Sequence, residues 1–524
     1  MDKTAVPSYY RDIMEKIHRA IFFWTLTLIF VIITPAIVLY ARGFRFDFNR
    51  GVFVHSGTIS IQSNPQEVEI TINGKESDSK TLNQINKSYN ISGLIPDTYD
   101  LSVSADGYQT WSKKVEVHSG QASEFWNIVL AKNDYAKTAY DTPGIGKFFI
   151  SPKNKNIIYT RENEGGLDAD IFNTQTKQST GTFNFPGWRF IAESRRENIE
   201  WSPDEDYIAV PVEKTVLENV GSETASETAS GSEPGEETIR YAYFILDPNK
   251  KTSFNLNDLL GNADINYARW DPKDKNYLFY LSNNALYRTN INNIPDTVTI
   301  AQDVSSFDLS RTNVYYARMP HELVYKTNLD GSGEPIQLTS DFPEGITRNF
   351  RLVAYDDTRI AFLTRNKDLY IFNNGEFDLY SKKLGADIEG LQFSDDGKKL
   401  LYWTKNAMSV YYLRNWNVAP LRSENSIEDI TRYSDEIKNI QWSKDYEHII
   451  FSSGAQVKII ELDPTDHRNS MELLKTDSAS PLVGYDHAQE RLYFVDTQDS
   501  STNLFSIVFP EPTPILGLYT PANE

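Results

Sequence analysis

The sequence predicts an all-β ectodomain behind a single N-terminal transmembrane helix. An uncharged apolar run lies near the N-terminus, short alternating strands follow it, and a phrase recurs at intervals of about 40–50 residues over the rest of the chain. Aromatic residues make up 13% of the chain, and they suit pleated, half-buried surfaces. We therefore expect a small β-sandwich and an eight-bladed, alternatively seven-bladed, β-propeller.

Composition excludes several kinds of chemistry. The chain has 524 residues, with 72 acidic and 52 basic side chains and a net charge of −20. Nucleic acid is not expected as a partner, because its phosphates would be repelled by most of this surface. Cysteine is absent, which excludes a disulfide framework, a thiolate nucleophile and a cysteine-ligated zinc site.

The membrane segment is predicted at residues 20–41, which carry no charge. About 20 apolar residues cross the hydrocarbon core, and Pro35 is tolerable in such a helix. Trp24 and Tyr40 lie near the two ends, where amphipathic rings favour the interface. A cleaved signal peptide and a buried core helix are the alternatives. The run is longer than a signal h-region and Leu39-Tyr40-Ala41 is no cleavage motif, so we expect a retained anchor that contacts membrane lipid.

Orientation is decided weakly by charge, since basic residues flank both ends of the apolar run. We expect residues 1–19 to form a short cytoplasmic N-terminus and 42–56 a juxtamembrane linker. The rest would then lie outside the cytoplasm, at the cell surface or in the periplasm. A cytoplasmic part of this size is too short to fold as a domain.

The first folded module is predicted at residues 57–131 as a small antiparallel β-sandwich. Residues 58–61 and 68–72 alternate polar and apolar side chains with a period of two. Asn73-Gly74 follows directly and is a strong hairpin signal. Further strands are expected at 99–104, 114–117 and 125–130.

This module resembles the PEGA domain family. The matching segments are Gly57–Ile61, Ser63-Asn64-Pro65, Val68–Gly74, Gly93–Val103 and Ala105–Tyr108. The signature that names the family is Pro96-Asp97-Thr98-Tyr99 here, so only its proline is kept. The resemblance implies an extracytoplasmic module in a bacterial or archaeal envelope, often beside a membrane helix. It implies binding or spacing and supplies no catalytic residue.

The rest of the chain repeats one phrase: an apolar pair, an aromatic residue, Ser or Asp, a turn, and a strand of apolar residues. The aromatic and apolar residues would pack between neighbouring blades, and radial closure would remove long exposed edges. The copies begin near residues 148, 199, 268, 307, 355, 391, 440 and 483.

Two segments of this region differ from the repeat. The interval between the copies at 199 and 268 contains a Glu/Ser/Thr-rich stretch that cannot bury enough apolar surface to order itself. We expect residues 216–239 to form a disordered loop inside one blade, as a solvated spacer rather than a partner-docking tail. Residues 511–524, rich in proline, are expected to form an extended tail.

The repeat resembles the WD40-like, TolB-type β-propeller, whose hallmark is a Ser-Pro-Asp-Gly turn. The nearest copies are Ser202-Pro203-Asp204 and Ser394-Asp395-Asp396-Gly397. The resemblance covers residues 135–510. Propellers of this type can precede a prolyl-oligopeptidase-like hydrolase domain, and the chain shows no such domain after residue 510.

Few residues suggest catalysis. The seven His residues show no metal-binding spacing, and there is no phosphate-binding loop or nucleophile elbow. Asp168 and Asp170 could be calcium ligands, but a polar hairpin turn is the better interpretation. We therefore predict no catalytic, cofactor-binding or metal-binding residues and no cofactor. The ligand-binding residues are not assigned.

Other residues are better explained by structure than by a site. Asp395, Asp396 and Asp445 occupy repeat turns and are interpreted as turn-formers rather than catalysts. Trp201, Trp270 and Trp442 share one position of the repeat and are interpreted as blade core rather than a sugar-stacking platform.

The sequence thus predicts a bacterial, single-pass, non-catalytic envelope protein. The propeller would bind a protein, peptide or glycan on one of its faces, and the PEGA-like module would act as a spacer or surface-binding module. One alternative is an assembly scaffold without a small ligand. Another is a propeller hydrolase or lyase with a site at the central channel, which would need acids, His or Arg converging from several blades.

Overall fold

The chain forms two compact units, each described by itself below. The first unit contains residues 1–130 and 464–469, and the second contains 131–463 and 470–524. A computed structural model describes residues 8–48, 50–77, 80–82, 87–153, 155–191, 199–218, 236–261, 264–340, 350–498 and 501–512.

The N-terminal helix is longer than the predicted membrane segment. Helix α1 spans Ser8–Ala41 with Pro35 inside it, so the described part of the expected N-terminal segment 1–19 continues the helix. Its apolar part, Ile17–Ala41, is long enough to cross a membrane, and none of it is buried in the protein. The helix ends where Gly43 adopts a φ of +86°, a left-handed conformation that glycine reaches without a Cβ clash.

The expected juxtamembrane linker 42–56 is instead largely a β-hairpin. Strands β1 (Phe44–Asp47) and β2 (Val52–His55) pair antiparallel. Both strands are rich in aromatic and β-branched side chains, which favour extended backbone over a free linker.

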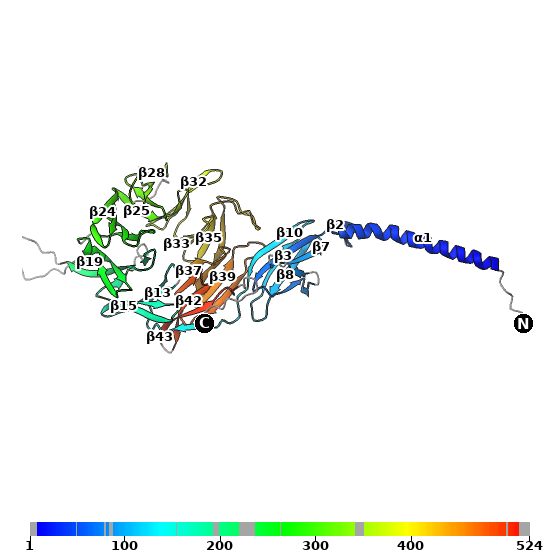
Figure 1. The fold of residues 1–524 in the computed structure, drawn as a ribbon, viewed down its shortest axis with the longest axis horizontal. Coiled ribbons are helices and arrows are strands. Elements are labelled where there is room, and N and C mark those ends of the chain that lie inside the picture. The colour runs from blue at the N-terminus through cyan, green and yellow to red at the C-terminus, as the bar shows by residue number, and fades with distance from the viewer. Residues whose placement is uncertain are drawn as a thin grey trace, which may run out of the picture. The chain divides into compact units, whose positions relative to one another are not determined.

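Two four-stranded sheets follow (Figure 1). The Asn73-Gly74 hairpin is confirmed, because Ile72 pairs with Lys75 and both turn residues have positive φ. The antiparallel prediction is wrong at one edge, where β10 pairs parallel with β3. In sheet order the strands are β10 (Ala122–Val129), β3 (Gly57–Asn64), β7 (Tyr89–Leu94) and β6 (Lys80–Leu82), then β5 (Lys75–Glu76), β4 (Glu69–Ile72), β8 (Thr98–Ser104) and β9 (Trp111–Glu116).

The core of these sheets follows the period-two pattern. Ile59 and Ile61 of β3 and Leu101 and Val103 of β8 are buried, while their chain neighbours are more exposed. The rings of Trp111 and Phe125 meet edge to face at 5.3 Å and connect a strand of one sheet to a strand of the other.

A short segment from late in the chain belongs to this first unit, which the predicted boundaries 57–131 and 135–510 did not anticipate. Residues 464–469 lie against strand β9. Lys113, only 2% exposed, donates from Nζ to the carbonyls of Thr465 (2.9 Å) and His467 (2.7 Å). The Asp466 carboxylate accepts from the Lys114 amide at 3.0 Å. A buried ammonium needs such acceptors, and here the late segment supplies them.

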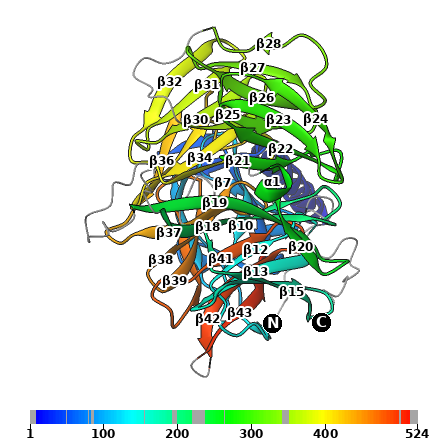
Figure 2. The same cartoon turned by 90° about the vertical axis from the view of Figure 1, so that its left-hand side faces the viewer.

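The second unit is a succession of antiparallel sheets arranged one after another (Figure 2). The first four in chain order contain β12 (Lys147–Ile150), β13 (Asn156–Asn163), β14 (Gly166–Asn173) and β15 (Gln178–Pro186); β16 (Arg189–Phe190), β17 (Glu200–Trp201), β18 (Ile208–Glu218), β19 (Glu236–Asp247) and β20 (Thr252–Asn255); β21 (Tyr267–Trp270), β22 (Tyr277–Ser282), β23 (Ala285–Asn290) and β24 (Asn293–Ala301); and β25 (Val304–Leu309), β26 (Asn313–Arg318), β27 (Leu323–Asn328) and β28 (Ile336–Gln337). A one-turn helix, α2 (Leu256–Leu259), follows β20 and is capped by the Asn255 side chain.

The remaining sheets repeat the same order. They contain β29 (Phe350–Asp356), β30 (Arg359–Thr364), β31 (Leu369–Asn374) and β32 (Leu379–Gly385); β33 (Gly390–Phe393), β34 (Lys399–Trp403), β35 (Ala407–Tyr412) and β36 (Ile427–Arg432); β37 (Ile437–Trp442), β38 (His448–Ser453), β39 (Gln456–Glu461) and β40 (Ser470–Lys475); and β41 (Val483–Asp486), β42 (Arg491–Gln498) and β43 (Ser501–Val508) together with β11 (Thr138–Tyr140).

The last sheet closes the succession into a β-propeller. Its outer strand β11 comes from the start of the unit and pairs antiparallel with β43, near its end. The first strands β12 and β41 are in contact, and Figures 1 and 2 show β13 and β42 side by side. Closure pairs the two ends of the domain, which leaves no long free edge between its first and last sheets.

The predicted loop at residues 216–239 is shorter in the structure. Strands β18 and β19 pair from Ile208–Leu246 out to Glu218–Glu236, because alternating residues on both sides of the acidic stretch continue the ladder. Residues 219–235, and residues 513–524 of the predicted tail, lie outside the described residues.

Candidate binding surface

Each copy of the repeated phrase begins at the first strand of its sheet, and one position of the phrase lies on that strand. Several of these first strands contact the first strand of a neighbouring sheet. Polar side chains at this position bind neighbouring backbone. The Gln392 amide oxygen accepts from the Trp442 amide (3.2 Å), and that of Gln441 accepts from the Tyr485 amide (2.8 Å). In chain order the position holds Phe149, Glu200, Arg269, Asp308, Ala354, Gln392, Gln441 and Gly484.

Three of these positions form a charged group. Arg269 forms ion pairs with Glu200, whose Oε1 lies 2.7 Å from Nε, and with Asp308 through Nη1. Burial opposes the charge on Arg269, but the two carboxylates outweigh that effect and hold its pKa well above the ordinary arginine value. The Asp308 carboxylate also accepts from the Ala354 amide at 2.9 Å. Each charge thus has a partner from another sheet.

The charged group of Glu200, Arg269 and Asp308 therefore connects three neighbouring sheets. Both carboxylates pair with the Arg269 guanidinium, and Asp308 also accepts from the backbone amides of Leu309 and Ala354. The repeat alignment would have found these residues, since all occupy one position, but it could not show that Glu200, Arg269 and Asp308 meet.

The repeat turns place Asp396 and Asp445 as the sequence predicts. Asp396 accepts from the Ser394 hydroxyl (2.7 Å) and from the Lys398 amide (3.0 Å). Asp445 accepts from the amides of Glu447 (3.1 Å) and His448 (3.2 Å). Both carboxylates therefore cap tight corners, as short acidic side chains do in turns. Asp395 precedes Asp396 in the same turn, and its side chain is exposed.

Side chains from four consecutive sheets meet around Asp395, and we call Tyr355, Asp395, Tyr446 and His487 the turn surface. The Tyr355 hydroxyl donates to the Asp395 carbonyl at 2.5 Å. The Tyr446 ring stacks on His487 with centroids 5.7 Å apart and an angle of 22°. Burial raises the pKa of Tyr446, and the Asp395 carboxylate raises it further, so its hydroxyl keeps its proton at neutral pH.

Tyr446 has an unusual backbone conformation. Its φ is +53°, and Gly397 in the equivalent position of the preceding repeat has a φ of +63°. A bulky residue in the left-handed region costs of order 1–3 kcal/mol, and such outliers concentrate at functional sites. Sequence reasoning missed Tyr446, although a Tyr in the glycine position of a Ser-x-Asp-Gly turn was a visible signal.

The turn surface lies over a buried ion pair. Lys399 is 1% exposed, pairs with Glu447 and donates to the Tyr446 carbonyl at 2.6 Å. Its ammonium also lies 4.1 Å from the centroid of the Trp416 ring. Lys399 therefore holds the strained residue in place from below.

Two histidines near this surface have opposite electrostatic environments. Burial alone would lower the pKa of His448, but Asp445, bonded to its Nδ1 at 2.6 Å, outweighs burial and raises it. Burial lowers the pKa of His487. Its Nδ1 is buried and has no hydrogen-bond partner among the residues that the structure describes.

The turn surface combines several kinds of side chain that can contact a ligand. It offers partly exposed aromatic faces, neutral hydroxyls and an exposed carboxylate. Aromatic faces and convergent polar groups of this kind are typical of recognition surfaces.

Asp168 and Asp170 lie on strand β14, not in the turn that was expected. Arg161 bonds Asp170 at 2.7 Å and approaches Asp168 at 4.0 Å. Thr182 and Asn184 of the next strand donate to the same carboxylates. Alternation along the strand places both acids on one face, opposite a cation. Among the described residues no group of three possible metal ligands is found.

The three repeat tryptophans are buried, as predicted. Their exposed fractions are 9% for Trp201, 4% for Trp270 and 0% for Trp442. Trp270 donates to the Glu200 carbonyl (3.1 Å), and Trp442 donates to the Gln392 carbonyl (3.2 Å). Trp270 and Trp442 thus join neighbouring first strands, and all three rings are too buried to stack on a ligand.

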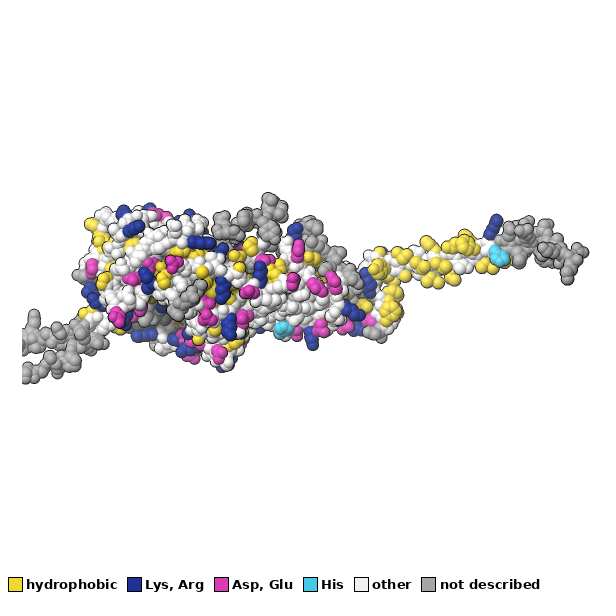
Figure 3. Space-filling model, turned by 90° about the horizontal axis from the view of Figure 1, so that it is seen from below, with side chains coloured by type: hydrophobic (Ala, Val, Ile, Leu, Met, Phe, Trp, Pro, Cys, Tyr) yellow, Lys and Arg dark blue, Asp and Glu magenta, His cyan; other side chains and the backbone are white. Residues whose placement is uncertain are grey.

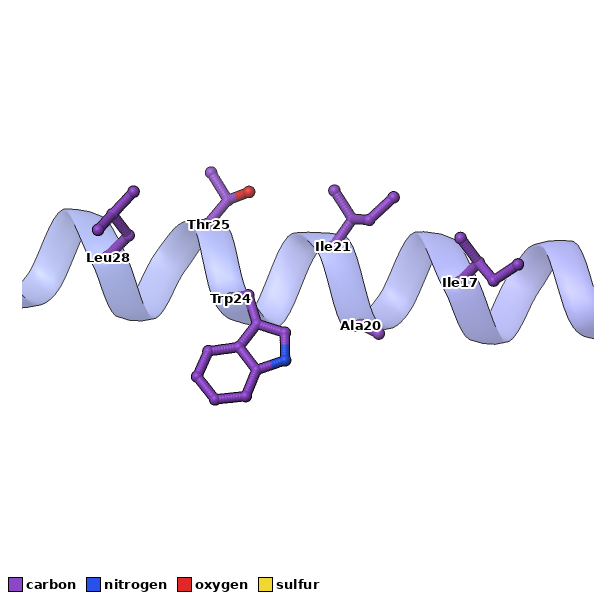
Figure 4. Close-up of a pocket in the computed structure, with 6 residues that line it drawn as sticks. All are labelled: Ile17, Ala20, Ile21, Trp24, Thr25 and Leu28. Atoms are coloured by element: carbon purple, nitrogen blue, oxygen red, sulfur yellow. The ribbon is translucent and has the colours of Figure 1, made fainter.

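The apolar face of α1 is a surface and not a cavity. Figure 4 shows Ile17, Ala20, Ile21, Trp24, Thr25 and Leu28 along a single helix, with no second element opposite them. A lone apolar face of this kind is suited to lipid or to another helix.

Comparison with known proteins supports part of this description. Residues 56–132 match the model of the PEGA domain, which confirms the resemblance seen in the sequence. No curated protein matches the chain.

Among solved structures, the chain is similar to several at low identity. The β-propeller domain of Cps50 (Swd1) from Myceliophteria thermophila is 11% identical, with a TM-score of 0.38, covering 72% of this chain and 98% of that one. A eukaryotic initiation factor is 12% identical, with a TM-score of 0.42 and coverage of 73% and 91%. Hsv2 from Kluyveromyces lactis is 11% identical, with a TM-score of 0.38 and coverage of 63% and 98%. Nothing about function follows from scores this low, and the propeller assignment rests on the strand pairing.

Proposed function

We propose that this chain is a non-catalytic, membrane-anchored envelope protein that displays a β-propeller for binding a protein, peptide or glycan. The observation that carries the proposal is helix α1, whose apolar part Ile17–Ala41 leaves all of its side chains unburied. So long an apolar surface is unstable in water and matches the thickness of a bilayer.

The PEGA match and the propeller support a binding or scaffold role. In the proposal, the two sheets of residues 57–131 form a sandwich that acts as a spacer or surface-binding module. The eight sheets described in the second unit are eight blades of the TolB type, in a protein of a bacterial envelope. The N-terminus lies in the cytoplasm and the rest lies outside it.

The anchor and its orientation can be tested with the natural absence of cysteine. We would label a Phe377→Cys variant, at a position 78% exposed in the propeller, with a membrane-impermeant maleimide on spheroplasts. A Lys3→Cys variant is the matched control. Labelling at 377 only, in a protein that resists alkaline carbonate extraction, supports the proposal. Labelling at position 3 only would show that the chain has the opposite orientation. Release by carbonate would show that α1 does not anchor the protein in the membrane.

Binding can be tested at the turn surface. We would screen the full chain in detergent against peptide and glycan arrays and compare the wild type with Tyr446→Gly. Glycine suits a φ of +53°, so this variant removes the ring without harming the backbone. Loss of binding in Tyr446→Gly but not in Phe377→Ser supports the surface. Equal binding by both variants assigns the ligand to another part of the propeller.

A further inference from the structure

The hairpin that follows α1 exposes an unusual number of aromatic and apolar side chains. Phe48 is 87% exposed, Phe53 51%, Val52 49% and Phe46 38%. The ring of Phe46 meets those of Phe48 and Phe53, both at 5.1 Å. A contiguous exposed aromatic cluster marks an interaction surface rather than scattered surface residues.

The two faces of the hairpin are different. Phe44 pairs with His55 and Phe46 with Phe53, so these four share one face. Arg45 and Asp47 lie on the other face, which is the more buried of the two at β1. The Arg45 guanidinium lies 3.1 Å from where a Cβ on Gly93 would stand, and Asp47 is 5% exposed. On the aromatic face, His55 lies against Gly120 of the module, with Nδ1 3.2 Å from where a Cβ would stand, while the rings of Phe46 and Phe53 remain exposed.

The hairpin is held directly to the end of the helix. The Gly43 amide donates to the Tyr40 carbonyl (3.0 Å), and the Ser56 amide and hydroxyl both donate to the Gly43 carbonyl (2.8 and 2.7 Å). The Arg45 guanidinium stacks on the Tyr40 ring at 3.8 Å. Only Arg42 and Gly43 separate α1 from β1, a span of roughly 10 Å at most. The medium around the end of α1 therefore also surrounds the hairpin.

The charges near this face suit a lipid headgroup region. Arg42 and Arg50 are exposed, and the Arg50 guanidinium makes only a loose contact of 3.6 Å with Asp47. Guanidinium groups bind phosphate in a forked geometry, and they keep their charge at the interface while their stems lie on apolar surface. In a chain with a net charge of −20, this local excess of arginine is a distinct feature. Figure 3 shows the hydrophobic surface of the helix continuing onto the element beside its end, next to basic side chains.

We propose that the β1–β2 hairpin is a membrane-interface element. Its aromatic face enters the boundary between headgroups and acyl chains in the leaflet where α1 ends, and Arg42 and Arg50 bind lipid phosphates. An amphipathic element at this depth places its apolar face about 5–10 Å into the interface. The first module is then held against the bilayer instead of swinging on a free linker. This inference rests on the proposed membrane anchoring by α1.

The test is depth measurement by spin labelling of the full chain in vesicles of phosphatidylcholine and phosphatidylglycerol. The chain contains no cysteine, so single variants take one nitroxide each. Phe48→Cys reports the hairpin, Phe30→Cys, 67% exposed on the helix, reports the anchor, and Phe377→Cys is the matched exposed control. The three substitutions replace exposed Phe, which keeps the fold intact.

We expect the labels at 30 and 48 to be more accessible to oxygen than to a water-soluble nickel chelate. The label at 48 should lie at a shallower depth than the label at 30. The label at 377 should be accessible to the chelate. A buried label at 30 with an aqueous label at 48 overturns the hairpin inference and leaves the anchor standing. Aqueous labels at both positions overturn the anchor itself. Spin–spin broadening at 48 that disappears on dilution with unlabelled protein would assign the aromatic face to a second copy of the chain and also overturn the inference.

Discussion

Lys399 and Glu447 form an ion pair that water barely reaches, with side chains 1% and 3% exposed. Burial lowers the pKa of Lys399 and raises that of Glu447, and the pairing opposes both shifts. The attraction between the two charges thus offsets the cost of removing them from water, whereas either charge buried alone would destabilise the fold. It connects the sheet of β34 to the turn that carries Tyr446.

Removing one partner should therefore be costly. We expect Glu447→Gln to lower the free energy of unfolding by about 3–5 kcal/mol, because the Lys399 ammonium is then buried without its counter-charge. The double variant Lys399→Met with Glu447→Leu should recover much of this loss. Denaturant unfolding followed by tryptophan fluorescence measures both. A Glu447→Gln variant as stable as the wild type would show that the pair is hydrated in solution.

His448 and His487 respond to pH in opposite directions. The pKa of His448 is raised in the fold by Asp445, and Glu461 and Glu447 act in the same sense. Its interaction therefore stabilises the protein fully below the ordinary pKa of about 6.5 and is lost as the pH rises through the raised value. The lowered pKa of His487 makes the fold lose stability as the pH falls below that ordinary value, since the unfolded chain then binds the proton more tightly.

Comparison of two variants separates these effects. The stability advantage of the wild type over His448→Gln should grow from pH 8.5 to pH 5.5, whereas the advantage over His487→Gln should shrink over the same range. Thermal or denaturant unfolding at several pH values measures both differences. The same pH trend in both variants would contradict the assigned environments.

At the scale of the element, the repeat turn determines which residue its last position accepts. Gly397 has a φ of +63°, and a Cβ there would stand 2.2 Å from the Tyr355 ring. Both the backbone conformation and the space exclude a side chain. Glu205 and Tyr446 hold the equivalent position of their own turns with φ values of +67° and +53°, so the contact with Tyr355 is what distinguishes Gly397.

We expect Gly397→Ala to destabilise the propeller by about 1–3 kcal/mol, since the residue must adopt a strained φ and displace Tyr355. Gly454→Ala is the matched control, because its φ is +57° with no atom within 4 Å of the added Cβ. It should show the conformational cost alone. If denaturant unfolding shows that both variants lose the same free energy of unfolding, the contact with Tyr355 does not contribute to the loss in Gly397→Ala.

At the scale of the whole propeller, closure depends on a short strand. Strand β11 pairs with β43 over three residues, and side chains reinforce it. The Tyr140 hydroxyl and the Ser506 hydroxyl are 3.0 Å apart, and Thr142 accepts from the Leu504 amide at 2.8 Å. The ring of Tyr140, 5% exposed, also packs against Phe172 and Tyr493.

Tyr140 should therefore affect the entire second unit. We expect Tyr140→Phe to cost about 0.5–1.5 kcal/mol for the hydrogen bond and Tyr140→Ala about 3–5 kcal/mol for the cavity and lost contacts. Hydrogen exchange should show faster opening in β11 and β43 and also in distant sheets. Faster exchange confined to these two strands would mean that the propeller does not unfold as one unit.

Much of the architecture was predictable from local pattern. Alternation predicted the strands of the first module, Asn73-Gly74 predicted its hairpin, and the repeated phrase predicted the sheets of the second unit, because strand formation and turns depend on neighbours in the chain. The hairpin within residues 42–56, which were predicted as a linker, was missed because strand β1 has only four residues, too few for a clear period. The parallel pairing of β10 with β3 was missed because register between distant segments leaves no local signal.

The candidate surface was less predictable than the fold. The repeat identified Asp395, Asp396 and Asp445 as turn residues, and all three lie in turns. It did not single out Tyr446, because the place of Tyr446 in the turn surface depends on its φ value and on its contact with His487 in the next sheet. Nor could it show that Lys399 meets Glu447, since residues 48 apart in the chain come together only when two sheets pack.

By itself the sequence determined the apolar run of α1, the PEGA resemblance, the presence and approximate spacing of the repeats and the absence of cysteine, because these are properties of composition and of neighbouring residues. The tertiary structure alone decided that β11 closes the propeller, that Arg269 joins three sheets, that residues 464–469 belong to the first unit and that the aromatic face of the β1–β2 hairpin is exposed. Each of these depends on contacts between distant segments, whose free energy appears only when loop closure has brought them together.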